Sequence, residues 1–531
     1  MQNITRILAM AALLLTAGFQ QPTQHLTDVP AHPWDLILAR PTDTSVTASL
    51  LAYNKDAEAY LEYGTTRGSY PNKTAVKAFP KNQAGTILLS GLPANTRHYY
   101  RLQIRDAGTT AYSASPEFTF TTKRPAGSTF VFTMQADSHL DENTDPAIYT
   151  QALANMRADN PDFMVDLGDT FMTDKYGNNT YKDAEKQYYA QRYYFGLLCT
   201  NAPLLFTLGN HDGEQGRFLD GTTNNMTIWS NTLRKSLFPN PVPDSFYSGN
   251  STPDPVAGLP ENYFGWEWGD ALFLVLDPFW KTTRANNADN WSWTLGDAQY
   301  QWLKRTLETS QAKYKFLFLH HLVGGADSSQ RGGSEAAKFY EWGGFSANNV
   351  NEFAAKRPGW PLPIHQLLVA NKVSAVFHGH DHLYVKQDLD GIVYQEVPQP
   401  GFPRFNQPAS ATEYGYVTGT ILGTTAPVSM PDGFGAGPNA AIATFFFAST
   451  VSLQPETLYY LEPIVQSGDQ WVICDGEYFY FRGTEIGLGT SFPASDLWFR
   501  EGILVPEPSA LAVVLLGAGV LAWMRRGRRG C

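Results

Sequence analysis

Short apolar runs along the N-terminal side of the chain predict an all-β region. Runs such as 46–51, 59–63 and 99–104 are separated by turns rich in Gly, Pro and Asn, and this pattern extends over residues 34–122. Strands at such spacing are typical of a β-sandwich. The segment 123–128, which contains Pro125 and Gly127, is predicted to be a linker.

After residue 128 the pattern changes to alternating strands and helices. A strand-like run at 130–135 precedes a helical stretch at about 146–158 and a second strand at 163–167. A helix at 183–198 and strands at 204–208, 271–276, 316–319 and 375–377 continue the series. This order predicts an α/β fold with ligand-binding loops at the strand ends. Residues 383–500 are aromatic, Gly-rich and strand-like, with no interpretable motif.

Length and composition limit the classes of protein to consider. A chain of 531 residues with 43% apolar residues is expected to form two or more globular domains. A formal charge of −11 argues against a nucleic-acid-binding surface, because such surfaces need clustered Lys and Arg. The three cysteines form no CxxC pair, so neither thiolate metal sites nor a disulfide framework is expected.

The N-terminal end predicts export. Arg6 precedes an apolar run at 7–19, which has the length of a signal-peptide core, and we expect a signal peptide at 1–20 with cleavage soon after Ala17. An N-terminal core helix is the alternative, but residues 20–25 turn polar without helical periodicity.

The C-terminal end has three parts: Pro506-Glu507-Pro508, an apolar stretch at 509–524, and a basic cluster at 525–529. This tail, 506–531, resembles the PEP-CTERM sorting signal. The resemblance implies export across the inner membrane, recognition by an exosortase-like membrane enzyme, and a basic cluster that stays cytoplasmic. A plain C-terminal membrane anchor is the alternative. Whether the anchor is removed therefore stays open, and so does the choice between a cell-surface and a secreted location.

Five short motifs directly follow apolar runs. They are Asp137-Ser138-His139, Gly168-Asp169-Thr170, Gly209-Asn210-His211-Asp212, His320-His321 and Gly379-His380-Asp381-His382. Alternation along an extended segment would point residues i and i+2 the same way, so the first and last motifs are each expected to present two donors to one site. The glycines allow sharp turns and a close approach of the backbone to the ions.

The donor types predict the kind of metal. Imidazole, carboxylate and amide oxygen without sulfur indicate Fe, Zn or Mn rather than a structural zinc site. Seven ligands are too many for one ion. If one carboxylate bridges, each of two ions receives four protein ligands, and a separation of about 3.5–4 Å is that of phosphoester-hydrolysing metal pairs.

These motifs and their order resemble the calcineurin-like metallophosphoesterase superfamily between Asp137 and His382. The resemblance implies a four-layer β-sandwich core flanked by helices, expected at 128–500 with a strand-rich C-terminal extension. It implies one ion bound by Asp137, His139, Asp169 and His382, and another bound by Asp169, Asn210, His320 and His380. His211 matches the family's catalytic histidine, which contacts the phosphoryl group or protonates the leaving oxygen.

The N-terminal region, expected at 29–123, carries two further resemblances. Residues 91–101 look like the corner of a fibronectin type III-like domain, with His98 in place of the usual tyrosine, and Glu62-Tyr63-Gly64-Thr65 looks like the N-terminal module of purple acid phosphatases. The module carries no obvious chemistry of its own.

Several positions stay open. Many family members have Asp three residues beyond the bridging Asp, where this chain has Met172. Asp212 and Asp174 are the two candidates that could compensate as the partner of His211, and the choice between them is open. Purple acid phosphatases bind iron through a Tyr after the Gly-Asp motif; here His139 substitutes, and the purple colour should be absent. The resemblance favours His320 over His321 as a ligand. His378 is expected in the strand or as an outer hydrogen-bond donor.

The expected function is therefore hydrolysis of small phosphate mono- or diesters by a metal-bound hydroxide, on an exported, membrane-anchored enzyme with two metal ions and His211 as acid. No nucleic acid partner is expected. The alternative is a surface binding or matrix protein with a vestigial metal site. Substrate choice would lie in loops such as 213–262 and 322–362, whose aromatic residues suit either stacking or a core.

Overall fold

The computed structural model describes residues 26–177, 180–283, 290–326, 328–403 and 411, with the backbone of 485–487 and 490–492. The expected signal peptide, the sorting segment, Cys474 and Cys531 lie outside these residues. In the described part of the chain, no helix has the length and apolarity needed to cross a membrane. The chain divides into two units, 1–418 and 419–531, and the described part of the second is a hairpin of β20 (Glu485–Gly487) and β21 (Thr490–Phe492).

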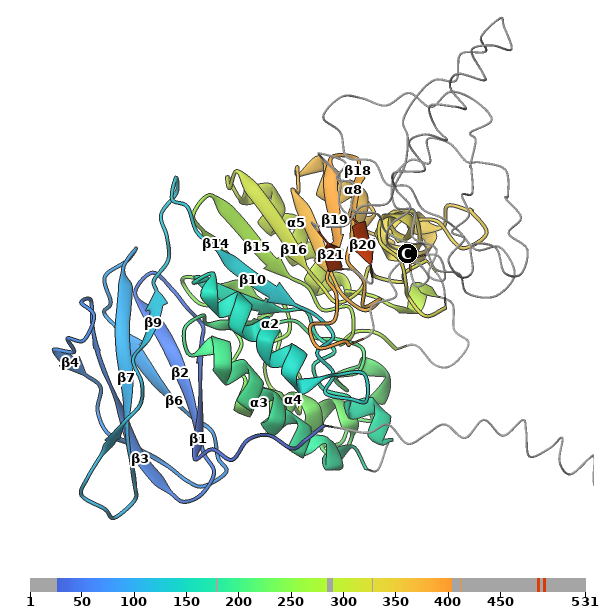
Figure 1. Cartoon of the computed structure of the whole chain (residues 1–531). Coiled ribbons are helices and arrows are strands. Elements are labelled where there is room, and N and C mark those ends of the chain that lie inside the picture. Colours follow the sequence, from blue (N-terminus) through green and yellow to red (C-terminus); the bar gives the residue numbers. More distant parts are fainter. Residues whose placement is uncertain are drawn as a thin grey trace, which may run out of the picture. The chain divides into compact units, whose positions relative to one another are not determined.

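Two β-sheets form the centre of the part that follows residue 128 (Figure 1). The first contains the parallel strands β10 (Phe132–Gln135), β11 (Phe163–Asp166) and β12 (Leu204–Phe206). The second has the order β13-β14-β15-β16-β17-β19-β18. Its strands are β13 (Ser248–Gly249), β14 (Phe264–Trp268), β15 (Ala271–Val275), β16 (Tyr314–Phe318), β17 (Ala375–His378), β18 (Val385–Leu389) and β19 (Ile392–Glu396).

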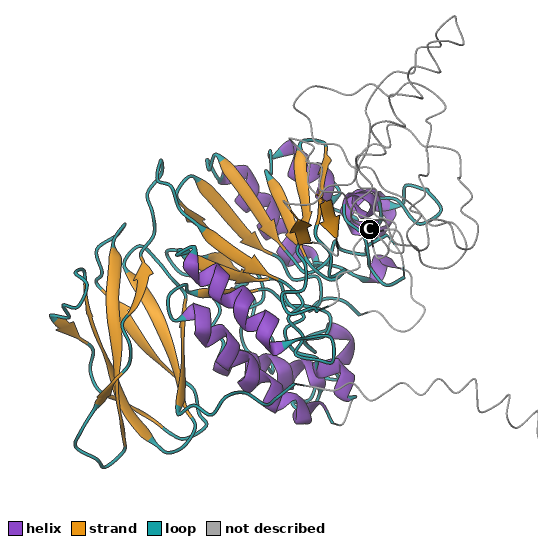
Figure 2. Cartoon of the chain, in the orientation of Figure 1, coloured by secondary structure: helices purple, strands orange, loops and turns teal. Residues whose placement is uncertain are grey.

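Helices cover the outer faces of both sheets (Figure 2). On the first sheet lie α2 (Pro146–Ala158) and α3 (Glu185–Cys199), and on the second lie α5 (Asp297–Thr309) and α8 (Ile364–Ala370). The connecting segments contain α4 (Met226–Leu237), α6 (Tyr340–Gly343), α7 (Phe353–Lys356) and the 3-10 turns η1 (Thr173–Tyr176), η2 (Tyr181–Ala184), η3 (Gly216–Phe218), η4 (Asn290–Ser292) and η5 (Ser334–Lys338).

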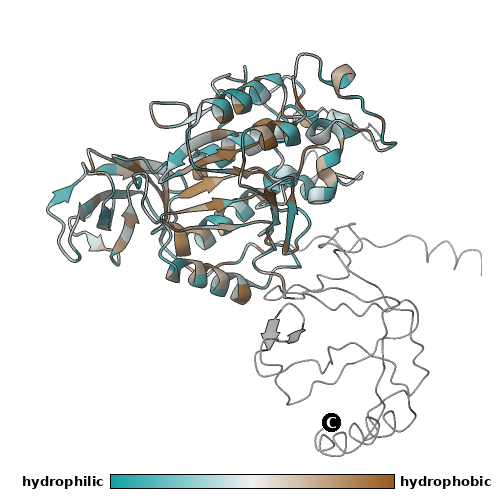
Figure 3. Ribbon diagram, turned by 90° about the horizontal axis from the view of Figure 1, so that it is seen from above, coloured by the Kyte–Doolittle hydropathy of each residue, from teal (hydrophilic) through white to brown (hydrophobic). Residues whose placement is uncertain are grey.

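Side-chain alternation along the strands explains the layers. In β15, Leu272 and Leu274 pack with the helices, whereas Phe273 and Val275 point to the space between the sheets. There Phe273 meets Phe163 of β11, with ring centroids 5.2 Å apart. The result is a helix–sheet–sheet–helix sandwich, and the brown strands of Figure 3 lie between more polar helices. The α/β fold class expected from the sequence is confirmed.

The helix expected at 146–158 forms with those bounds because its first turn is capped. The Asp145 side chain accepts hydrogen bonds from the backbone amides of Ala147 (2.8 Å) and Ile148 (3.3 Å), and Pro146 occupies the first helical position. The helix expected at 183–198 instead begins at Glu185, after η2.

The N-terminal region is β-rich, as expected. One layer contains β1 (Trp34–Ala39), β2 (Ser45–Ala52) and β6 (Gly85–Ser90). The facing layer contains β3 (Ala57–Gly64), β4 (Asn72–Lys73), β5 (Lys77–Phe79), β7 (Arg97–Asp106), β8 (Ser113–Ala114) and β9 (Phe118–Thr121). Between the layers, Leu50, Leu61, Tyr100 and Leu102 are fully buried.

This region shares a sheet with the part of the chain that follows it. β1 runs parallel to β12, with Ala39 paired to Leu204, so the first sheet continues as β10-β11-β12-β1-β2-β6. Along β1, Leu36 and Leu38 enter the N-terminal core, whereas Ile37 enters the core beneath the helices. The N-terminal strands therefore contribute side chains to both cores.

Candidate metal centre

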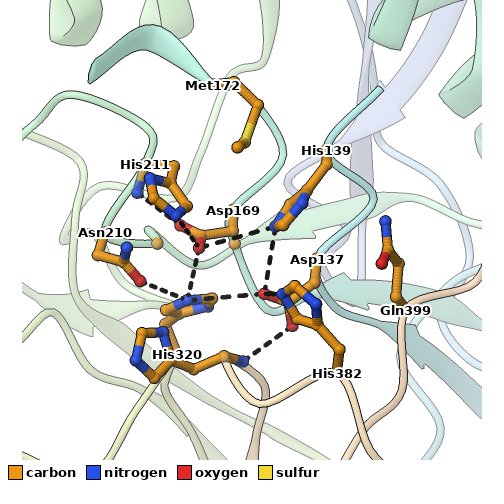
Figure 4. Close-up of polar contacts among 12 residues, drawn as sticks. Asp137, His139, Asp169, Met172, Asn210, His211, His320, His382 and Gln399 are labelled. Atoms are coloured by element: carbon orange, nitrogen blue, oxygen red, sulfur yellow. Dashed lines mark hydrogen bonds and ion pairs between the residues drawn. The ribbon is translucent and has the colours of Figure 1, made fainter. Parts of the chain in front are cut away.

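The five sequence motifs come together at one edge of the two sheets. Asp137 follows β10, Asp169 follows β11 and Asn210 follows β12, while His320 follows β16 and His380 follows β17. Because the carboxyl ends of parallel strands lie at the same edge, residues far apart in the sequence meet there. Figure 4 shows the side chains converging from both sheets.

The first group of donors contains Asp137, His139 and His382. The Oδ1 atom of Asp137 lies 3.6 Å from Nε2 of His139 and 3.4 Å from Nε2 of His382 (Figure 4). The carboxylate of Asp137 is fully buried. Three donor atoms thus face one point from two sheets.

The second group contains Asp169, His320 and His380, with Asn210 beside them. Nε2 of His320 lies 3.0 Å from Oδ2 of Asp169 and 3.0 Å from Oδ1 of Asn210. The same Oδ2 atom of Asp169 is 3.9 Å from Nε2 of His139, a member of the first group. Asp169 therefore stands between the two groups, where a bridging carboxylate is needed.

Outer hydrogen bonds fix which nitrogen of each histidine faces the centre. Nδ1 of His320 donates to the carbonyl of Leu167 over 2.9 Å, and Nδ1 of His139 donates to Oδ2 of Asp141 over 3.2 Å. Each bond leaves Nε2 as the nitrogen with the free lone pair. Metal-binding histidines show this pattern because the outer partner sets the tautomer and the ring orientation.

Several buried donor atoms lack a hydrogen-bond partner of their own. Nε2 of His139 and Oδ1 of Asp137 are in this state, and so is Nδ1 of His380, whose Nε2 donates to the carbonyl of Ser329 over 2.8 Å. An unpaired buried polar atom is costly unless a ligand compensates it. Together with the oxygen and imidazole donor set, these atoms fit metal ions.

Charge complementarity within the cluster is strong. Burial alone would lower the pKa of His139, but Asp137 and Asp141 overcome this effect and raise it to about 10. For His320, Asp169 and Asp137 likewise outweigh burial and raise the pKa to about 9. Burial would raise the pKa of Asp137, but the nearby histidines hold it well below its usual range. The cluster is thus built to hold cationic charge beside its carboxylates.

The backbone at the donors differs from the expected extended alternation. Asp137 and His139 have φ values of 57° and 49°, and His380 and His382 have values of 82° and 62°. Asp169 adopts 51°. The expectation of an i, i+2 strand geometry is wrong, because these residues leave the strands in left-handed turns. Such conformations are costly for non-glycine residues and cluster at functional sites.

Two glycines allow the loops of Asp169 and Asn210 to touch. Gly168 has a φ of 88°, and a Cβ atom there would lie 2.3 Å from the backbone nitrogen of Gly209. A Cβ atom on Gly209 would lie 2.0 Å from the backbone nitrogen of Asp169. Any side chain at either position would push the two donor loops apart.

His211 is tied to Asp174, which settles which acid contacts it. Nδ1 of His211 lies 2.9 Å from Oδ1 of Asp174, in the turn that follows Met172. Asp212 has a different task, because its carboxylate accepts hydrogen bonds from the backbone amides of both donor loops. The amides are those of Gly209 (2.6 Å), Asp169 (3.1 Å), Thr170 (3.0 Å) and Phe171 (2.8 Å).

The two remaining histidines lie beside the centre. Nδ1 of His321 faces the carbonyl of Leu322 at 3.0 Å, while its neighbour His320 supplies the atom near Asp169. His378 is buried in β17, where Nδ1 contacts the carboxylate of Glu396 and burial lowers its pKa to about 4.

Sequence reasoning missed the outer residues that hold the donor loops. Gln191 of α3 donates to Oγ of Ser138 (2.9 Å) and to the carbonyl of Thr170 (2.8 Å), joining two donor loops. Glu396 of β19 accepts from the backbone amide of Asp381 over 3.0 Å. Asp141, the outer partner of His139, could have been suspected from the sequence as an acid two residues after that histidine. Gln191 and Glu396 lie on elements that carry no motif.

The comparisons agree with this geometry. Residues 131–384 match the family model of the calcineurin-like phosphoesterases. This region is a calcineurin-like phosphoesterase domain, and the chain is a metal-dependent phosphoric ester hydrolase.

Two solved structures are similar to the chain at low sequence identity. The structure of PhoD is 15% identical, with a TM-score of 0.52, over 73% of this chain and 82% of PhoD. The purple acid phosphatase PPD1 from seeds of yellow lupin (Lupinus luteus) is 15% identical, with a TM-score of 0.45, over 69% of this chain and 64% of its own. None of the curated proteins matches this sequence.

Proposed function

We propose that the protein is an exported phosphoesterase with two metal ions, which hydrolyses small phosphate mono- or diesters. The observation that carries the proposal is the position of Asp169, whose Oδ2 atom lies between the two groups of donors and 3.8 Å from Nε2 of His211. A hydrolytic centre of this kind needs both a metal pair and an adjacent proton donor.

The residues for the two ions follow from the two groups. Asp137, His139 and His382 would hold one ion, Asn210, His320 and His380 would hold the other, and Asp169 would contact both. Ions of the Fe, Zn or Mn type, when bound, lower the pKa of water and neutralise phosphoryl oxygens. The protein's own contribution is to orient these donors through Leu167, Asp141 and Ser329.

His211 is the proposed general acid. Its Nδ1 atom is held by Asp174, so Nε2 is the atom that gives a proton to the leaving oxygen as the ester bond breaks. Positioned proton donors contribute typically 10²–10⁴-fold to rate. His211→Ala should lower turnover by such a factor while both metals remain bound.

The terminal segments support the proposed location. The signal-like segment at 1–20 and the PEP-CTERM-like tail at 506–531 favour export across the inner membrane, an exosortase-like processing partner, and a cell-envelope or secreted product. A pulse-chase experiment on tagged protein tests this: a size decrease that depends on Pro506-Glu507-Pro508 is expected, and an unprocessed cytoplasmic product would contradict it.

Metal content and hydrolysis together test the function. Elemental mass spectrometry on protein without the two terminal segments should find about two ions per chain. The same sample should hydrolyse p-nitrophenyl phosphate, its bis ester, or both, and the two rates rank monoester against diester. Protein that stays metal-free and inactive after reconstitution with Mn, Fe or Zn would favour a binding protein with a vestigial site.

A further inference from the structure

A cavity of about 300 Å³ opens beside the second group of metal donors. Asn210, His211 and His380 form one side of it. The volume lies at the lower end of small-molecule sites, which span roughly 300–1,000 Å³. The cavity therefore has room for a compact group next to the reacting phosphoryl group.

With His211 as the acid of the proposed function, the cavity would lie on the side from which the leaving group departs. His211, the proposed acid, is 19% exposed and forms part of the wall, with Nδ1 turned to Asp174. Because the acid must reach the oxygen that leaves, the remainder of the leaving group has to occupy the space beside His211.

Three cationic side chains line the same cavity, and they come from three separate segments. Lys175 belongs to η1, Arg217 to η3, and Arg331 to the loop before η5. Nη1 of Arg331 is anchored 2.7 Å from Oδ1 of Asp381. The guanidinium carbon of Arg217 lies 4.7 Å from the centroid of the Phe218 ring. Basic groups gathered from distant segments attract an anion.

The cavity offers little surface for stacking a nucleobase. Trp293 lines it but is 2% exposed, and its ring packs edge-on against His321, with centroids 5.1 Å apart. In the loops 213–262 and 322–362, Trp342 and Trp360 are likewise core residues. The cavity is therefore cationic rather than aromatic in character.

We propose that this cavity binds a second phosphate group carried by the leaving group, so that the preferred substrates are small bisphosphorylated compounds. The inference rests on the proposed function and adds its substrate class. Lys175 and Arg217 are the specificity-determining residues, because guanidinium and ammonium groups match a phosphate that remains bound while the other is cleaved.

A matched substrate pair tests the proposal. Initial rates on the metal-loaded protein would be measured with fructose 6-phosphate and fructose 1,6-bisphosphate, which differ by one phosphate. The kcat/KM for the bisphosphate should be the higher of the two. Arg217→Ala should reduce the ratio of the two kcat/KM values by roughly 10-fold, the effect of losing one charge-assisted hydrogen bond. Arg217→Lys should restore part of the ratio.

Controls separate this inference from the proposed function. Lys186→Ala removes an exposed charge on α3 outside the cavity and should leave the ratio unchanged. If p-nitrophenyl phosphate is hydrolysed but Arg217→Ala and Lys175→Ala slow both sugar phosphates equally, the cations serve the reacting phosphoryl group and the inference is wrong. If no ester is hydrolysed by the metal-loaded protein, the proposed function itself fails.

Discussion

Removing the charge of Asp174 tests how the catalytic histidine is held. Asp174→Asn keeps the size of the side chain but replaces the carboxylate that faces Nδ1 of His211 at 2.9 Å. The exposed fractions of the two side chains are 17% and 19%, so solvent screens part of their interaction. The variant should fold and bind metals as the parent does, because neither residue belongs to the two donor groups.

The expected loss can be estimated from this geometry. A hydrogen bond to a charged group contributes roughly 1.5–3 kcal/mol, and partial exposure reduces the figure to about 1–2 kcal/mol. If this energy is fully expressed when His211 acts, kcat should fall about 5- to 30-fold. The loss is smaller than that expected for His211→Ala, since a misoriented acid still supplies some protons.

A double-mutant cycle gives the decisive assay. Turnover of p-nitrophenyl phosphate would be measured for Asp174→Asn, His211→Ala and the double variant, with metal content determined for each. Asp174 acts through His211, so its substitution should cost nothing further once His211 is absent. Independent, additive losses would refute the reasoning, as would loss of metal in Asp174→Asn. Asp183→Asn, in the neighbouring turn η2, is the matched control.

Three further predictions follow from the site and its surroundings. His320→Ala should lower metal content from about two ions to about one, whereas His321→Ala should retain both, because the atom near Asp169 belongs to His320; equal losses by mass spectrometry would contradict this. In ion-free protein, the pKa values of His139 and His320 are raised to about 10 and about 9. Binding of the metal ions near pH 7 should therefore displace about two protons. Calorimetry should show this proton release, and the affinity for the metal ions should rise with pH. Burial raises the pKa of Asp277 to about 6, so the folded state binds a proton more tightly than the unfolded state. The free energy of unfolding should therefore fall as pH rises from about 4 to 6. In urea unfolding, Asp277→Asn should remove about 2–3 kcal/mol of this decline, and an unchanged pH dependence would refute the prediction.

Local patterns were sufficient to predict much of the fold. The helix of residues 146–158 was predictable because Asp145 and Pro146 form a start signal that acts within one turn. The strand-then-motif order also placed the donors at strand ends. The left-handed turns of Asp137 and His380 were not predictable, because only the packed surroundings hold non-glycine residues in that conformation.

Contacts between distant residues account for the remaining differences. Asp174 and Asp212 were equivalent candidates in the sequence. Asp212 directly follows His211, and Asp174 lies five residues after the bridging Asp169. The structure distinguishes them, because the carboxylate of Asp212 accepts hydrogen bonds from backbone amides, whereas that of Asp174 contacts His211. The pairing of β1 with β12 left no local pattern either, because each strand alone is a short apolar run that any sheet edge would accept.

The pairing of β1 with β12 limits when the first sheet can be completed during synthesis. Ala39 leaves the ribosome long before its partner Leu204, so the early strand stays an open sheet edge until the later one arrives. Contacts between such distant residues slow folding, because a large loop must close first. For a chain that we propose is exported, the shared sheet would therefore be completed only after Leu204 has also crossed the membrane.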